Sequence, residues 1–119
     1  MENNLTNPTC PFEKEHYQAL EDALYVLGGK WKISVINSIY SGNRRFREIE
    51  RSIPNITTRM LSKVLKELEL NQLINRTEYT EGPILVEYSL TAHSASLKEV
   101  LEALVKWGME HREVIRGSN

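Results

Sequence analysis

The stretch that most constrains this fold lies at residues 53–71, with the sequence IPNITTRMLSKVLKELELN. Pro54 fixes its own φ and disfavours helix at the residue before it, so the stretch opens with a turn. Thr57 can then cap a helix by accepting a hydrogen bond from the first free backbone amides. Apolar side chains recur at steps of three and four residues, which predicts one buried stripe along this helix: Leu61, Val64, Leu65 and Leu68.

The opposite face of the predicted helix carries cations and hydroxyls and no anion. Its members are Thr58, Arg59, Ser62, Lys63 and Lys66. Cations on such a face can reach DNA phosphates, and an arginine can also bind guanine through O6 and N7. A solvated outer face is the commoner explanation for an isolated amphipathic helix. Whether this face binds DNA or is only solvated therefore has to be judged from the surrounding segments.

Charge is distributed unevenly along the chain. The 119 residues have a formal net charge of -1, whereas residues 44–66 hold seven cations and two anions. A basic segment in a nearly neutral protein is typical of a nucleic-acid-binding face. The length and the 40% hydrophobic content predict one globular domain. Because no apolar run reaches membrane-spanning length and no hydrophobic signal follows Met1, we expect a cytoplasmic protein without membrane contact.

The segments before residue 53 carry helical patterns. They lie at residues 10–27, 30–40 and 44–52, with a Gly28-Gly29 break after the first and a loose arm at residues 1–9 before it. The expected buried side of the second helix consists of Trp31, Val35, Ile36, Ile39 and Tyr40. In the third, Phe46 and Ile49 are expected to be buried and Arg45 to face outward, where it can reach a phosphate.

After Asn71 the period of the pattern changes from helix to strand. Alternation over residues 84–90 and a turn at Glu81-Gly82-Pro83 predict a hairpin of residues 73–80 and 84–90. A helical pattern returns from Ser94, and its apolar stripe is too wide for one side of a small domain. We expect a second subunit to cover it, while burial inside one chain is the alternative. The candidate dimer contacts are Tyr17, Leu20, Leu97, Leu101, Leu104 and Trp107.

Together these elements predict a mainly α fold with a small β-hairpin. It is a winged helix-turn-helix, with the helix-turn-helix at about residues 44–71, the wing at about 73–90, and further dimerisation helices at both ends of one domain spanning 10–116. In this fold the third core helix enters the major groove and the wing follows the DNA backbone or the adjacent minor groove. The basic segment coincides with that helix, which favours double-stranded DNA as the partner. A protein-interaction module without a specific DNA site is the alternative.

The sequence carries no catalytic, cofactor or metal-binding motif. His16, His93 and His111 lack metal-ligand spacing, so we expect no metal, no cofactor and no enzyme activity, although a small enzyme or small-molecule receptor is a third alternative.

A single cysteine, Cys10, excludes an intrachain disulfide. Pro11 at a first helical position would place Cys10 at the N-cap, where the helix dipole favours thiolate; an inert thiol is the other alternative.

Several short motifs, in this order and at these separations, resemble the HxlR-type transcriptional regulators, which are winged-helix relatives of MarR. The resemblance covers Cys10 to about His111, and its motifs are Cys10-Pro11, Gly28-Gly29-Lys30-Trp31, Arg45-Phe46, Glu48-Ile49, Ile53-Pro54, Ile56, Met60-Leu61, Leu65, Glu67-Leu68, Val86-Glu87-Tyr88-Ser89-Leu90-Thr91 and Trp107-Gly108. It implies a homodimeric DNA-binding regulator of an inverted-repeat operator. It also implies that Cys10 can respond to oxidants or electrophiles, often through a disulfide between subunits.

Two departures from the family pattern affect the predicted sites. The family's wing is usually richer in proline and ends in an arginine, whereas this chain has Ile84 and Leu85 there. Arg76 is then the only cation of the hairpin, so we expect weak DNA contact from the wing. Ser94 replaces a usual glycine, which can change how the last helix starts. The sequence does not identify the operator, the regulated genes, the sign of regulation or any small-molecule effector.

Overall fold

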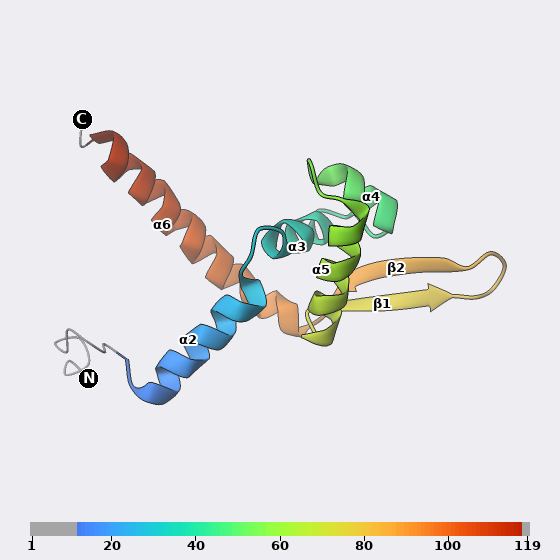
Figure 1. Ribbon diagram of the computed structural model, residues 1–119, viewed down its shortest axis with the longest axis horizontal. Helices are drawn as coiled ribbons and strands as arrows, with labels where there is room; N and C mark the ends of the chain where they lie inside the picture. Colours follow the sequence, from blue (N-terminus) through green and yellow to red (C-terminus); the bar gives the residue numbers. More distant parts are fainter. Residues whose placement is uncertain (1–11, 118–119) are drawn as a thin grey trace.

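A computed structural model describes residues 12–117 and shows a helical protein with one two-stranded sheet (Figure 1). The chain forms, in order, α2 (Lys14–Leu27), α3 (Lys32–Tyr40), α4 (Phe46–Ser52), α5 (Thr58–Leu70), β1 (Ile74–Tyr79), β2 (Leu85–Leu90), the 3₁₀ helix η1 (His93–Ser96) and α6 (Leu97–Gly117). This arrangement confirms the predicted winged helix-turn-helix with an additional helix at each end. The predicted loose arm at residues 1–9 lies outside the described residues.

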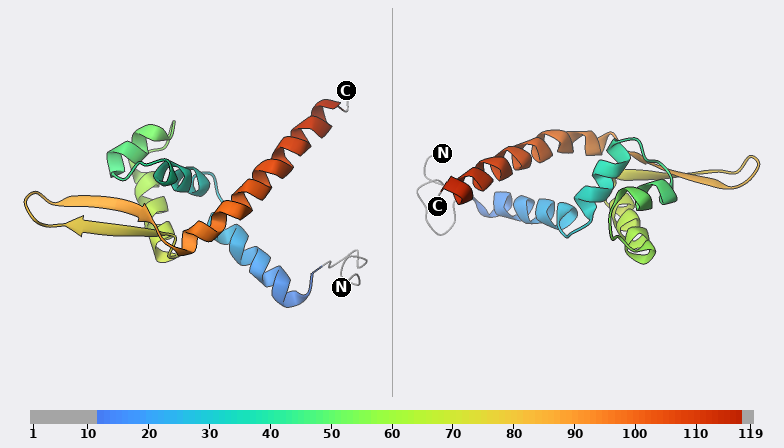
Figure 2. Two further views of the ribbon diagram at one scale, coloured as in Figure 1. Left: turned by 180° about the vertical axis from the view of Figure 1, so that it is seen from behind. Right: turned by 90° about the horizontal axis from the view of Figure 1, so that it is seen from above.

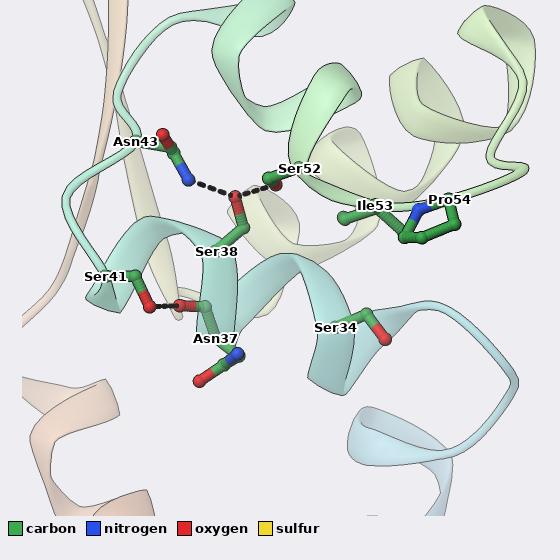
Figure 3. Close-up of a pocket in the computed structure, with 8 residues that line it drawn as sticks. All are labelled: Ser34, Asn37, Ser38, Ser41, Asn43, Ser52, Ile53 and Pro54. Atoms are coloured by element: carbon green, nitrogen blue, oxygen red, sulfur yellow. Dashed lines mark hydrogen bonds between the residues drawn. The ribbon is translucent and has the colours of Figure 1, made fainter.

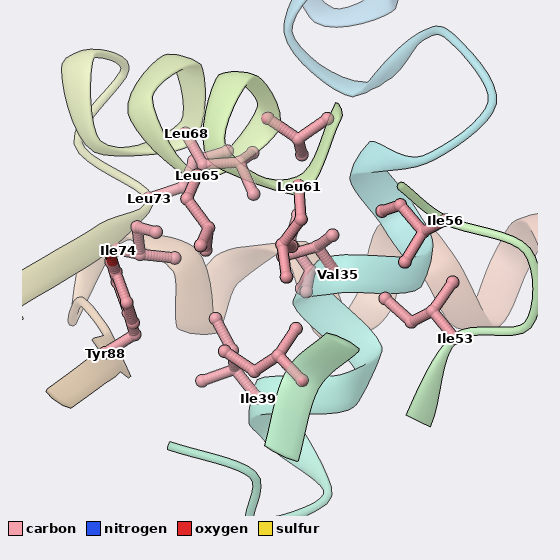
Figure 4. Packing of buried hydrophobic residues seen from close by; sticks show 13 residues of the cluster. Val35, Ile39, Ile53, Ile56, Leu61, Leu65, Leu68, Leu73, Ile74 and Tyr88 are labelled. Carbon is pink, nitrogen blue, oxygen red and sulfur yellow. The ribbon is translucent and has the colours of Figure 1, made fainter. Parts of the chain in front are cut away.

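One hydrophobic core holds α3, α4, α5 and the base of the hairpin together (Figure 4). Its buried members are Val35, Ile36, Ile39, Ile49, Ile53, Ile56, Leu61, Val64, Leu65, Leu68, Leu73, Ile74 and Tyr88. The set contains all four apolar residues predicted for the buried stripe of α5, so that prediction is confirmed. Because α5 buries this side, its cationic side is turned away from the core.

The start of α5 follows from its local sequence. The turn before it includes Asn55 with a φ of 69°, a left-handed conformation that asparagine tolerates better than most residues. Thr57 is the N-cap, and its hydroxyl accepts a hydrogen bond from the backbone N–H of Met60 at 3.0 Å. The predicted cap is therefore confirmed. It fixes the end of the helix at which Thr58 and Arg59 are exposed.

The hairpin is antiparallel and is joined to the core at its base. Its register runs from Ile74 opposite Leu90 to Tyr79 opposite Leu85. The backbone N–H of Tyr88 donates to the carbonyl of Arg44 at 2.8 Å, which connects β2 to the segment before α4. These bonds fix the base of the wing relative to the helix-turn-helix, while its tip extends away from the core (Figure 1).

Several predicted helix boundaries are wrong. α2 begins at Lys14 with Glu13 as its N-cap, later than the predicted start at residues 10–11; Cys10 and Pro11 lie outside the described residues. α4 begins two residues later than predicted, at Phe46, because the backbone at Arg45 is extended (φ -104°, ψ 151°). The last helical segment starts with η1 rather than with regular helix, and Ser94 is buried there.

The predicted buried side of α3 is also wrong at one position. Val35, Ile36 and Ile39 are buried and Trp31 packs partly against the core, as expected. Tyr40, in contrast, is 66% exposed. It is the last residue of α3 and directly follows the buried Ile39, so the helix turns its side chain away from the core.

The two terminal helices extend away from the core on the side opposite the wing (Figures 1 and 2). Neither α2 nor α6 contains a buried residue, although both are amphipathic. The radius of gyration is 18.1 Å, against about 13 Å for a compact domain of this length. We call α2 and α6 the two arms.

No helix in residues 12–117 is both long enough and apolar enough to cross a membrane.

Candidate nucleic-acid interface

The outer face of α5 presents every side chain that the sequence predicted for it. Thr58, Arg59, Ser62, Lys63 and Lys66 are all exposed. Among the described residues, no carboxylate forms an ion pair with the three cations of this face. No described carboxylate therefore neutralises their charges. An exposed set of this kind on the second helix of a helix-turn-helix can bind phosphates and base edges.

Glu50 connects α4 to the first residue of α5. The hydroxyl of Thr58 donates a hydrogen bond to the Glu50 carboxylate, and Nη1 of Arg47 donates to its Oε1 at 2.9 Å. The hydrogen bond from Thr58, followed by the one from Arg47, lowers the pKa of Glu50 below its ordinary value. Thr58 is thus a predicted DNA contact whose hydroxyl hydrogen is already used. Sequence reasoning missed this link, although the anion within a basic segment was a signal for it.

Replacing Glu50 with glutamine is expected to make the melting temperature depend less on pH in the acid range. Because folding lowers the pKa of Glu50, its contribution to the free energy of unfolding is present above the ordinary value of 4.5 and is lost as the pH falls through the lowered value. Thermal melts from about pH 7 to about pH 3 measure this. Below 4.5 the melting temperature of Glu50→Gln should fall less steeply than that of the wild type.

Glu69→Gln is the matched control, since Glu69 lies on α5, is exposed and forms no ion pair with a residue of 12–117. It should keep the wild-type pH dependence. The same acid response in wild type and Glu50→Gln would show that the Glu50–Thr58 bond does not contribute to stability in solution.

Glu48 organises the start of α4 in a similar way. Its Oε1 accepts hydrogen bonds from the backbone N–H groups of Arg44 at 2.9 Å and Arg45 at 3.2 Å. These two bonds hold the pKa of the Glu48 carboxyl below its usual range. Arg45 is exposed at the N-cap of α4, where the sequence predicted a phosphate contact. Glu48 therefore stabilises the extended backbone that presents Arg45.

The wing offers little free positive charge. Nη1 of Arg76 donates to Oε2 of Glu78 at 3.2 Å, and a side-chain hydrogen bond with Tyr88, followed by that with Glu78, raises the pKa of Arg76 above its ordinary value. Arg76 stays a predicted DNA contact, but a neighbouring carboxylate compensates its charge. Nearer the tip, Tyr79 is 48% and Ile84 is 74% exposed. Ile84 and Leu85, where the family usually has an arginine, carry no charge for a phosphate, and weak wing contact stays a prediction.

A polar pocket of about 280 Å³ lies between α3 and the turn that follows α4 (Figure 3). Ser38 and Ser52 share a hydrogen bond of 2.6 Å, and Asn43 Nδ2 donates to Ser38 Oγ at 3.1 Å. The other lining residues are Ser34, Asn37, Ser41, Ile53 and Pro54. No lining side chain is an acid, a base or a thiol, so the pocket holds no general base that could activate one of its four serines as a nucleophile. It therefore gives no support to the enzyme alternative.

The predicted dimer contacts lie on the two arms. Tyr17 and Leu20 on α2 are 49% and 41% exposed, and Leu104 and Trp107 on α6 are 53% and 63% exposed. Leu97 and Leu101 are only partly exposed, and Leu97 packs against the core. Sequence reasoning left out further exposed apolar residues of the arms, namely Tyr25, Met109, Val114 and Ile115. No group of acidic, histidine or cysteine side chains in residues 12–117 is arranged to hold a metal ion.

Known proteins resemble this chain over most of its length. An uncharacterized HTH-type transcriptional regulator from Methanothermobacter thermautotrophicus is 46% identical over 96 residues, which cover 81% of this chain and 73% of the relative. A crystal structure of a MarR-family transcriptional regulator from Enterococcus faecalis V583 matches with a TM-score of 0.76 and 31% identity, covering 93% of this chain and 97% of that one.

A third similar protein is HypR, described as a redox regulator. Its reduced form matches with a TM-score of 0.73 and 37% identity, covering 83% of this chain and 98% of HypR. The oxidised form matches with a TM-score of 0.69. The model of the HxlR-like helix-turn-helix family matches residues 26–116, which include the core, the wing and almost all of α6. The chain therefore belongs to the HxlR-like helix-turn-helix family of DNA-binding transcriptional regulators.

Proposed function

We propose that this protein is a sequence-specific transcriptional regulator that binds an inverted-repeat operator as a homodimer. The observation that carries the proposal is the outer face of α5. Arg59, Lys63 and Lys66 are exposed there, and no carboxylate of the described residues forms an ion pair with them. The helix lies where a helix-turn-helix protein places its recognition helix.

The proposed contacts divide into base reading and phosphate binding. Arg59 lies in the first turn of α5, the part of a recognition helix that reaches base edges. Lys63 and Lys66 follow at steps of about one helical turn and bind phosphates, as does Arg45 from the start of α4. Ser62 adds a hydroxyl contact between Arg59 and Lys63. Thr58, whose hydroxyl hydrogen is donated to Glu50, contacts DNA only as an acceptor. Arg76, paired with Glu78, contributes least.

The homodimer is supported by the arms. Both are amphipathic, and yet neither buries a residue within one chain. Exposed apolar patches of this extent are typical of protein interfaces. A second copy that pairs its arms with these would bury both apolar faces and hold two α5 helices on one duplex. The dimer then matches the symmetry of an inverted repeat.

Selection of bound duplexes from a random DNA pool tests this function, with roughly physiological salt and a reductant present. We expect enrichment of an inverted repeat whose half-sites are about 10 base pairs apart, or a multiple of that distance. No enriched motif, together with binding that disappears at modest salt, would instead support a protein-interaction module.

We further propose that Cys10 makes DNA binding sensitive to oxidants or electrophiles. The support comes from HypR, which resembles this chain in both its reduced and its oxidised form. Cys10 is the only cysteine of the chain, so a disulfide can form only with another molecule. That disulfide would join two subunits through their N-terminal segments and could change the geometry of the dimer.

The variant Cys10→Ser tests this role. Treatment of the wild type with diamide is expected to shift operator affinity by about tenfold, the size of an ordinary coupling between two sites. It should also produce a dimer that resists SDS until reductant is added. Cys10→Ser should bind DNA as the reduced wild type does, with or without the oxidant. An unchanged oxidant response in Cys10→Ser would remove the sensing role and leave the DNA-binding proposal intact.

A further inference from the structure

Lys32 differs from the other lysines of the described chain in its burial. Its side chain is 14% exposed, whereas every other lysine of residues 12–117 is exposed. It lies at the first position of α3, where the N-terminal arm α2 meets the core. Because burying an ammonium costs free energy unless it has partners, its surroundings indicate what it does.

The Lys32 ammonium contacts both the arm and the recognition helix. Its Nζ donates a hydrogen bond to the backbone carbonyl of Tyr25 at 3.1 Å and lies 5.2 Å from the centre of the Tyr25 ring. The same Nζ is 3.7 Å from Oε1 of Glu67 on α5. The Tyr25 carbonyl belongs to the last turn of α2, where carbonyls lack partners within the helix. One ammonium therefore connects the C-terminal end of α2 to α5.

The link between arm and core is otherwise short. Residues 28–31 separate α2 from α3 and begin with Gly28 and Gly29. Gly29 has a φ of +89°, which an L side chain rarely adopts. A Cβ at Gly28 would collide with the backbone carbonyl of Leu24. The arm contributes only Val26 and Leu27 of its last turn to the packing around the core. The first two residues of this connection have no side chains to fix the direction of α2, so the Lys32 contacts are placed to do so.

We propose that Lys32 is a positioning residue that sets the direction of arm α2 relative to α5, and through it the half-site spacing that the protein accepts. The inference rests on the proposed function, because spacing has a meaning only for a dimer on an inverted repeat. In a dimer joined through its arms, the angle between α2 and α5 determines the separation of the two recognition helices. Operator spacing follows that separation.

The test compares Lys32→Met with Lys30→Met. Methionine keeps an unbranched apolar side chain and removes the ammonium. Lys30 is a matched control, because it lies two residues before Lys32, is exposed, and has its Nζ 4.9 Å from the centre of the Trp31 ring. Affinity is measured by fluorescence anisotropy for duplexes that carry the selected half-sites at the best spacing and at one or two base pairs more or less. A duplex with a single half-site is measured beside them.

In the wild type and in Lys30→Met, affinity should fall steeply away from the best spacing. In Lys32→Met, the ratio of the affinity at the best spacing to the affinity at an altered spacing should shrink by about tenfold. This is the size of an ordinary coupling between sites. Single-site affinity should stay unchanged in all three proteins. Glu67→Gln, which removes the partner charge on α5, should shrink the ratio in the same direction and gives a second test if Lys32→Met does not fold.

Two results would overturn the inference while leaving the proposed function in place. One is an unchanged spacing ratio in Lys32→Met, or in Glu67→Gln where Lys32→Met does not fold. The other is a uniform loss of affinity at every spacing with a lowered melting temperature, which would show general structural support only. A wild type that binds all spacings, and a single half-site, equally well would instead contradict the proposed dimeric function.

Discussion

Replacing Arg59 with alanine is expected to weaken operator binding by about 1–3 kcal/mol and to relax base preference at one position of each half-site. The guanidinium lies in the first turn of α5, is exposed, and forms no ion pair with any carboxylate of the described residues. It can therefore present both nitrogens of its fork to a guanine. Competition binding with duplexes that differ at single bases measures both the loss and the relaxed preference.

Lys66→Ala is the matched control on the same face, since it removes one positive charge nearer the other end of α5. A phosphate contact carries no sequence information, so this variant should weaken binding equally across sequences and lower the salt slope by about 1. If Arg59→Ala behaved in the same way, Arg59 would be a phosphate contact only. If neither variant changed binding, the outer face of α5 would not be the DNA interface.

Replacing Leu104 with glutamate is expected to convert the protein to a monomer and to lower operator affinity by about 10²–10⁴-fold, the gain that linking two binding modules supplies. Leu104 is 53% exposed on α6, so the substitution disturbs little packing within one chain. In the proposed dimer it would bury an unpaired carboxylate between two arms, which is strongly unfavourable. Sedimentation equilibrium measures the subunit number, and anisotropy measures the affinity.

Lys106→Glu serves as the control for this variant. It lies two residues after Leu104, about 200° around the helix, and therefore on the other side of α6. Its substitution introduces the same glutamate and an even larger change of charge. The control should remain dimeric and keep most of its operator affinity. A Leu104→Glu protein that stays dimeric would mean that α6 does not form the interface.

Much of the helix-turn-helix could be predicted because its signals are local. The buried stripe of α5 repeats every three to four residues, and its cap depends on Thr57 and a backbone amide three residues later. The hairpin shows a period of two and a Gly-Pro turn. Each of these patterns lies within one element, so the sequence displays it without knowledge of the packing.

The parts that were missed depend on contacts between elements. Glu50 and Thr58 are eight residues apart and meet only because the turn between α4 and α5 brings them together. Lys32 reaches Tyr25 seven residues before it and Glu67 in a different helix. A long, flexible lysine or glutamate side chain has many possible partners, and the tertiary structure selects among them. Helical periodicity marked the arms as apolar, but it did not show that they extend away from the core.

For the wing, one feature could be predicted from the sequence and another is visible only in the fold. The absence of an arginine at Leu85 could be read from the sequence and indicated weak DNA contact. The pairing of Arg76 with Glu78 becomes visible only in the fold, although the two residues are close in sequence. It places a carboxylate beside the hairpin's cation and so weakens its attraction to phosphate. The α5 face consequently carries most of the expected DNA affinity.

The most direct test of a dimer that reads an inverted repeat is the ratio of its affinities for a duplex with two half-sites and for a duplex with one. The wild-type chain is titrated against the selected operator and against the same duplex with one half-site scrambled, at about 0.15 M salt. A symmetric dimer with two recognition helices predicts that the intact repeat binds about a hundredfold or more tightly. A ratio near one, with both affinities disappearing as salt rises, would contradict it and leave only non-specific attraction to phosphate.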